Sequence, residues 1–141
     1  MKVFLIGANG QLGSEVLQLA NDLNINCEAF SSSELDITDH KKVSNLIKAG
    51  TPNIIINASA YTKVDEAEEN KDLAFKVNSH AIENLARCAL KNSSVLIHVS
   101  TDYVFCGSKK NGYDEKSKTN PKNVYGHSKL EGENHIRSIL K

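Results

Sequence analysis

The stretch Val3-Phe-Leu-Ile-Gly7-Ala-Asn-Gly10-Gln-Leu-Gly13 decides the fold of this chain, because it joins a short apolar strand to a helix through a glycine-rich turn. Glycine at position 7 permits a tight turn, Gly10 lets the backbone approach a phosphate, and Gly13 lets the helix pack closely on the strand. The helix presents unpaired N–H groups and its positive dipole end to the turn. A dinucleotide-binding turn is predicted, although the spacing Gly-x-x-Gly-x-x-Gly differs from the common Gly-x-Gly-x-x-Gly.

Beyond this turn, short apolar runs alternate with segments of helical periodicity. Strands are predicted at residues 3–6, 27–30, 54–57 and 95–99. Helices are predicted at 12–23, 39–49 and 73–90, and from about 123 towards 140. The run 109–123, rich in Lys, Asn, Gly and Ser, is expected to be a loop on the substrate side. This order predicts a parallel sheet covered by helices on both faces, a three-layer α/β/α Rossmann-like fold.

Size and charge narrow the functional classes. The chain has 141 residues, with 17 basic and 17 acidic side chains, which is room for one domain and gives no reason to expect nucleic acid or an anionic membrane as partner. No apolar run could span a bilayer or serve as a secretory signal. Cys27, Cys88 and Cys106 lack a Cys-x-x-Cys pair and indicate free thiols in a reducing cytoplasm. The five histidines show no ligand spacing, so they are assigned to the surface or to packing and no metal site is predicted.

Four strands make an incomplete dinucleotide-binding sheet, which normally has about six strands in two halves. The chain supplies the first half and the start of the second. We therefore expect residues 1–141 to be the N-terminal part of an NAD(P)-binding Rossmann domain that stops before the last strands, with the C-terminal substrate-binding part outside it. The uncovered sheet is expected to leave an apolar face exposed.

Near the end of the chain, Tyr125 and Lys129 stand four residues apart, which places both on one face of a helix. A lysine ammonium one turn from a tyrosine favours the phenolate, so the phenol can exchange a proton near neutral pH. The hydroxyl-rich run Ser100-Thr101-Asp102-Tyr103 follows the fourth predicted strand. With the glycine turn, these features predict a nicotinamide-dependent reductase.

The end of the second predicted strand carries the run Ser31-Ser32-Ser33, where dinucleotide-binding proteins often place an acidic residue or an arginine. Serine hydroxyls accommodate either a ribose hydroxyl or a 2′-phosphate, so the choice between NADH and NADPH stays open. Asp36 and Ile37 follow. They fit either a contact with the adenine or an ordinary helix cap and core residue.

Together these residues resemble the extended short-chain dehydrogenase/reductase family, and within it the dTDP-4-dehydrorhamnose reductase branch. The resemblance rests on five runs that cover nearly the whole chain in order: Gly7-Ala-Asn-Gly-Gln-Leu-Gly13, Leu35-Asp-Ile-Thr38, Asn57-Ala-Ser-Ala-Tyr-Thr-Lys-Val-Asp65, Ser100-Thr-Asp-Tyr-Val-Phe105 and Asn123-Val-Tyr-Gly-His-Ser-Lys-Leu-Glu-Gly-Glu133. The third and fourth runs are specific to the branch, whereas the glycine turn and the Tyr/Lys pair are shared across the family.

The resemblance implies a role for each of these runs. Tyr125 donates a proton to the sugar oxygen, Lys129 holds the nicotinamide ribose, and Thr101 polarises the substrate carbonyl. Asp102 lies against the sugar. The implied cofactor-binding residues are Gly7, Gly10, Gln11, Leu12, Gly13, Ser31, Asp36, Ile37, Ala58, Ala60, Tyr61, Thr62, Val99, Tyr125 and Lys129. The implied reaction is reduction of the 4-keto group of dTDP-4-dehydro-L-rhamnose by NADPH or NADH, and the resemblance leaves room for a homodimer.

Two departures and two alternatives accompany this interpretation. Cys106 stands where the family usually has an acidic or small residue, and Ser59 replaces an alanine. Asn78 is either a brace for the active-site backbone or an ordinary residue on a helix surface.

The alternative functions are a nucleotide-sugar epimerase or dehydratase of the same family, and a non-catalytic cofactor-binding module like the regulatory subunit of methionine adenosyltransferase. The 141 residues alone are expected to bind cofactor without turning over the keto-sugar.

Overall fold

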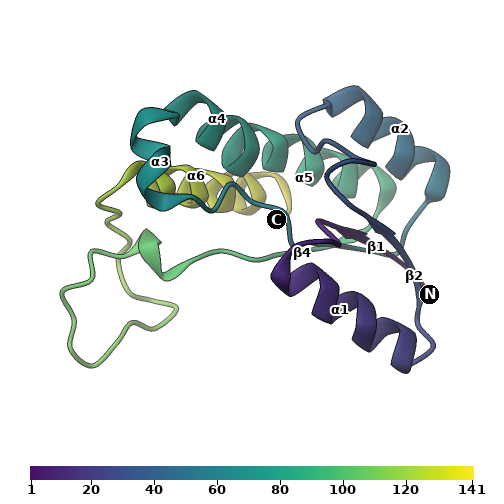
Figure 1. The fold of residues 1–141 in the computed structure, drawn as a ribbon, viewed down its shortest axis with the longest axis horizontal. Coiled ribbons are helices and arrows are strands. Elements are labelled where there is room, and N and C mark those ends of the chain that lie inside the picture. Colours follow the sequence, from purple (N-terminus) through teal and green to yellow (C-terminus); the bar gives the residue numbers. More distant parts are fainter.

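A parallel four-stranded sheet forms the centre of the computed structural model, which describes residues 1–141 (Figure 1). The strands are β1 (Lys2–Ile6), β2 (Asn26–Phe30), β3 (Ile54–Asn57) and β4 (Val95–His98), in the order β2-β1-β3-β4. The chain passes from β1 outward to β2 and then returns to the other side of β1. This reversal between β1 and β3 is the point where parallel α/β sheets bind ligands, at the carboxyl ends of the strands.

Helices cover both faces of the sheet, as predicted. Helix α1 (Gln11–Asp22) lies on one face, and α2 (His40–Gly50), α5 (Ala81–Asn92) and α6 (Val124–Ile139) pack side by side on the other (Figure 1). Asp39, the first residue of the helix predicted at 39–49, is the N-cap of α2, because its carboxylate accepts a hydrogen bond from the Lys42 N–H. None of the helices combines the length and apolar character needed to cross a membrane.

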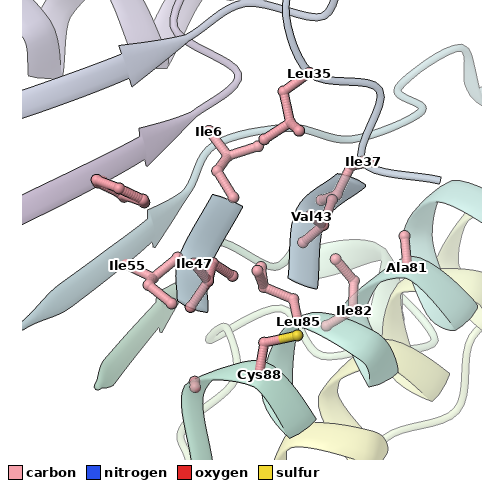
Figure 2. Close-up of a cluster of buried hydrophobic side chains, with 12 residues drawn as sticks. Ile6, Leu35, Ile37, Val43, Ile47, Ile55, Ala81, Ile82, Leu85 and Cys88 are labelled. Atoms are coloured by element: carbon pink, nitrogen blue, oxygen red, sulfur yellow. The ribbon is translucent and has the colours of Figure 1, made fainter. Parts of the chain in front are cut away.

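The core lies between the sheet and the three-helix face (Figure 2). Phe4 and Ile55 on the strands meet Ile47 of α2 and Leu85 of α5, and all four are fully buried or nearly so. Burial of each such side chain contributes roughly 1.5–3 kcal/mol relative to exposure. The other members of this cluster are Ile6, Leu35, Ile37, Val43, Ala81, Ile82, Cys88 and Ala89. This packing fixes α5, and through it α6, against the sheet.

The opposite face is sparsely covered. The helix predicted at 12–23 is present as α1, but Leu19 and the C-cap residue Leu23 are 57% and 61% exposed. On β4, the alternate side chains of Val95 and Ile97 are also exposed on this side, at 59% and 47%. The expected open apolar face is therefore present.

The segment that precedes β4 is more elaborate than the single helix predicted at 73–90. A short helix α3 (Val64–Glu69), which was not predicted, comes before α4 (Lys71–Phe75), and a π-helical turn η1 (Lys76–His80) joins α4 to α5. The apolar residues of this segment face the core: Ala74, Ala81, Leu85 and Ala89 are fully buried, and Val77 is partly buried. The short 3₁₀ turn η2 (Asp102–Val104) follows β4, and the predicted loop 109–123 contains no helix or strand.

Helix α6 lies directly on the backbone of the two short turns. A Cβ atom at Gly132 would collide with the carbonyl oxygen of Asn78 in η1, and a Cβ at Gly126 would collide with the carbonyl oxygen of Tyr103 in η2. Glycine at these two positions therefore permits an approach that any side chain would prevent.

Replacing Gly132 with alanine is expected to lower the free energy of unfolding by about 1–3 kcal/mol, the usual cost of overpacking. Urea unfolding followed by circular dichroism measures this change. Asn134→Ala, on the exposed side of the same helix, serves as the control. Helix propensity alone favours alanine at both positions, so a Gly132→Ala variant as stable as the parent would show that α6 does not rest on η1.

Candidate active site

A cleft of about 490 Å³ opens at the carboxyl ends of β1, β3 and β4. Its walls come from the turn after β1, the loop after β3, the end of β4 and one side of α6. The lining residues are Gly7, Asn9, Gly10, Gln11, Leu12, Ser32, Ala58, Ser59, Ala60, Thr62, Val99, Ser100, Tyr125 and Lys129. The glycine turn and the Tyr/Lys pair, more than 110 residues apart in sequence, therefore face one space.

The turn after β1 has the geometry of an anion-binding site. Gly7 adopts φ +88°, and its N–H donates to the carbonyl of Phe30 at 2.9 Å, which ties the turn to the end of β2. Helix α1 begins at Gln11 without a side-chain cap and without an acidic residue in its first turn. Because Gly10, Gln11 and Leu12 line the cleft, the uncapped amino end of a 12-residue helix meets the space where a phosphate would bind.

The glycines of this turn have different structural roles. A Cβ at Gly13 would collide with the carbonyl oxygen of Gly7, which confirms that Gly13 serves helix–strand packing; its side of the helix is buried and lies outside the cleft. At Gly10 a Cβ would meet only the Gly7 oxygen, at 3.4 Å, so the protein itself has room for a side chain there. The room at Gly10 is on the cleft side, where a ligand would lie.

Tyr125 and Lys129 lie in the first turns of α6, which starts at the N-cap Asn123, whose side chain accepts from the Gly126 N–H. Tyr125 is 8% exposed and Lys129 2% exposed, yet both contribute to the wall of the cleft. The Lys129 amine donates to the carbonyl of Val99 at 2.6 Å. Burial lowers the pKa of Lys129 to about 8, against the opposing charge of Glu133.

Asn78 holds this arrangement together, so of the two alternatives for this residue the structure shows the brace and not the plain helix surface. Its side chain accepts from the Tyr61 N–H at 2.9 Å and donates to the Tyr61 carbonyl at 3.0 Å. It also donates to the hydroxyl of Ser128, which in turn donates to the carbonyl of Tyr125. The π turn that carries Asn78 thus connects the loop after β3 to the turn of α6 that bears the phenol. Such π turns recur at functional sites.

Thr101 and Asp102 lie beside the cleft and do not line it. The Thr101 hydroxyl caps η2 by accepting from the Tyr103 N–H at 3.2 Å. The Tyr103 ring packs edge-on against Tyr125, with ring centroids 5.6 Å apart. This contact brings η2 next to the ring of Tyr125.

Asp102 borders a shallower depression together with Tyr103, Phe105, Cys106, Gly107, Lys122 and Asn123. Hydrogen bonds with Ser108 and Tyr113 lower the pKa of the Cys106 thiol to about 7. The Phe105 and Tyr113 rings stack at 4.3 Å and shape this side of the loop. The departure noted at Cys106 therefore lies on the expected substrate side.

Four further residues named as cofactor contacts also lie outside the cleft. Ile37 is a core residue, 6% exposed, so the packing alternative describes its side chain and the predicted adenine contact does not. Asp36 accepts from the N–H and hydroxyl of Thr38 and closes a local turn. Ser31 is hydrogen-bonded to Glu34. Tyr61 contributes its backbone to Asn78 instead of facing the cleft.

Sequence reasoning missed several residues at the site. Asn9, Ser59 and Ser100 line the cleft, and so does Ser32 from the serine run that was considered for the ribose. Each follows closely on a predicted strand, and that position is the signal that could have identified them. His98 is a correction, because the structure places it 3.3 Å from the Lys129 amine and not merely at the surface or in packing. No three His, Cys, Asp or Glu side chains gather in a way that could hold a metal ion.

Several known proteins are similar to this chain in sequence and in fold. The dTDP-4-dehydrorhamnose reductase of Aggregatibacter actinomycetemcomitans is 45% identical over 134 residues, which are 94% of this chain and 45% of that protein. The corresponding reductase of Mycobacterium tuberculosis H37Rv is 40% identical, over 94% of this chain and 44% of its own length. The chain spans about half the length of the curated relatives it matches.

Solved structures agree with these sequence matches. The dTDP-4-dehydrorhamnose reductase of Bacillus anthracis in complex with NADP superposes with a TM-score of 0.94 at 39% identity, over 99% of this chain and 50% of that one. The Clostridium acetobutylicum protein gives a TM-score of 0.95 at the same identity and coverage. The family described as the RmlD substrate binding domain matches residues 1–141. On this match over its whole length, the chain belongs to the RmlD substrate binding domain family.

Proposed function

We propose that this chain provides the cofactor cleft and the proton donor of an NAD(P)H-dependent reductase that converts dTDP-4-dehydro-L-rhamnose to dTDP-L-rhamnose. One observation carries the proposal: the uncapped amino end of α1 and the Tyr125/Lys129 pair of α6 line the same cleft. The relatives named dTDP-4-dehydrorhamnose reductase support the choice of reaction over an epimerase or dehydratase.

The residues present fit a dinucleotide. The N–H groups of Gln11 and Leu12 would hold the pyrophosphate, and Gly10 would leave its path open. Ser32 lies at the end of β2, where the adenosine ribose would sit. Lys129, Val99 and Thr62 line the part of the cleft near Tyr125 and would hold the nicotinamide end. Serine at the ribose position suits NADPH and NADH alike, and the NADP in the Bacillus anthracis relative favours NADPH.

The chain's own residues then act on the sugar oxygen. When bound, the reduced cofactor supplies the hydride that adds to the keto carbon. Tyr125 gives its proton to the oxygen as negative charge develops there. Thr101 turns its hydroxyl from Asp102, 3.3 Å away, towards the same oxygen, and Asp102 contacts the sugar. The Lys129 amine stays anchored on Val99 and orients the ribose.

The setting of the reaction follows from the same proposal. The partner is a small nucleotide sugar, and its thymidine diphosphate supplies the binding energy that positions the keto group. All three cysteines are free, which supports a reducing cytoplasm as the place of action.

Replacing Gly10 with valine is expected to weaken NADPH binding by about tenfold or more, since a β-branched side chain would occupy the path of the pyrophosphate. Isothermal titration calorimetry on the 141-residue chain measures this affinity. Thermal unfolding is the control and should show a folded protein with a modest loss of stability, because valine is a poorer N-cap than glycine although the backbone at Gly10 is extended (φ −75°, ψ 166°) and a Cβ has room there. Equal NADPH affinity in a folded Gly10→Val variant would rule out this phosphate site.

Turnover is tested in a chimaera in which the chain replaces the matching portion of the Aggregatibacter actinomycetemcomitans reductase. Tyr125→Phe is expected to lower kcat by about 10²–10⁴-fold with little change in NADPH affinity, because the phenol acts in the transition state. Lys129→Met should impair both quantities. Oxidation of NADPH in the presence of the keto-sugar, followed by absorbance, measures the rate. Wild-type turnover by Tyr125→Phe would remove Tyr125 as the proton donor and point to Tyr103, its neighbour.

A further inference from the structure

His98 and Asn57 form a side-chain pair directly beneath the cleft. They are register partners on the parallel strands β3 and β4, so their side chains lie next to each other on the same face of the sheet. Asn57 Nδ2 lies 2.9 Å from His98 Nδ1. Asn57 is fully buried, and His98 is partly buried. The pair is therefore fixed by the sheet itself.

The hydrogen bonds around Asn57 determine the proton on the imidazole. The backbone N–H of Ser59 donates to Asn57 Oδ1 at 3.1 Å, and a backbone N–H can only donate. The amide NH₂ of Asn57 must then face His98, so Nδ1 of the imidazole accepts. In a neutral imidazole the remaining proton lies on Nε2. Burial, together with the neighbouring Lys129, lowers the pKa of His98 to about 3, which keeps the ring neutral.

The protonated Nε2 of His98 faces Lys129 Nζ at 3.3 Å. An ammonium group has three hydrogens and no lone pair, so it cannot accept this hydrogen bond. An uncharged amine can, and it can still donate to the carbonyl of Val99. The contact geometry thus matches the uncharged amine, which with a pKa of about 8 is the main form of Lys129 above pH 8 and the minor form at pH 7.

Few other ionisable groups lie near the Lys129 amine. On α6, Tyr125 lies one turn before Lys129 and Glu133 one turn after it. The Glu133 carboxylate is the charge that opposes loss of the lysine proton, and it is already shared between the Ser100 hydroxyl and Arg137. From η2, Tyr103 reaches Tyr125, and from β4 only His98 reaches the amine.

We propose that His98, oriented by Asn57, is a positioning residue that donates a hydrogen bond to the Lys129 amine whenever this amine is uncharged, and so fixes it at the edge of the cleft. The pair is no proton relay, because the Asn57 amide beyond the ring ends the path. One consequence rests on the proposed function: dinucleotide binding, which uses the hydrogens of the ammonium, takes up a proton at pH values above the midpoint of Lys129.

The first test is the titration of Lys129 in the 141-residue chain, followed by NMR of lysine labelled with ¹³C at Cε and assigned by loss of the signal in Lys129→Met. His98→Asn keeps an acceptor for Asn57 but removes the donor to Lys129. It is expected to raise the midpoint of Lys129 by about one pH unit towards the usual value. His135→Asn, on α6 but away from the amine, is the matched control and should leave the midpoint unchanged. The same midpoint in His98→Asn and the parent would overturn the proposal.

The second test needs no variant. The ¹⁵N chemical shifts of the His98 ring at pH 7 are expected to show Nε2 protonated and Nδ1 unprotonated. A ring protonated on Nδ1, alone or together with Nε2, would overturn the proposal. Neither of these two tests uses a cofactor, so their results do not depend on the proposed function.

Calorimetry of NADPH binding at pH 9, in two buffers of different ionisation enthalpy, measures the proton uptake. Binding without proton uptake would contradict the consequence drawn for Lys129.

Discussion

The close approach of α6 to the backbones of η1 and η2 is the contact on which the rest of the site depends. Tyr125 and Lys129 reach the cleft because Gly126 and Gly132 let their helix lie against the carbonyl groups of two neighbouring turns. A side chain at either glycine would push the helix outward and withdraw the phenol and the amine together. Helix α6 therefore needs glycines for close packing and also carries the phenol and the amine of the site.

Buried polar groups strengthen this contact. Asn78 and Ser128 connect the loop after β3 to the Tyr125 turn, and Asn57 and His98 connect two strands to Lys129. Each of these groups would cost stability if buried without a partner, so together they select one arrangement of the strands and α6. The cofactor side of the site is held by buried contacts, whereas the side near Cys106 is shaped mainly by partly exposed loop contacts such as the stack of Phe105 on Tyr113.

Local patterns predicted much of this molecule. The four strands, the parallel arrangement and the main helices were correct to within a few residues, because apolar periodicity and caps such as Asp39 act over short distances. The separate roles of Gly7 and Gly13 were also predictable, since each is set by the backbone of a single turn. Helix α3 and the π turn were missed, because contacts with α6, more than 40 residues later, stabilise them.

The sequence by itself determined the family, the order of the elements and the two groups of residues that meet in the cleft. Only the tertiary structure decided which of these residues face the cleft. Ile37 and Lys129 are both buried, yet one packs in the core and the other lines the cleft, because their directions depend on how the loop before α2 and helix α6 pack against the sheet. His98 shows the same limit, since its partner Asn57 is 41 residues away and the two are joined only by strand register. Spacing along a chain fixes which side of an element a residue occupies, but the packing of elements fixes what that side meets.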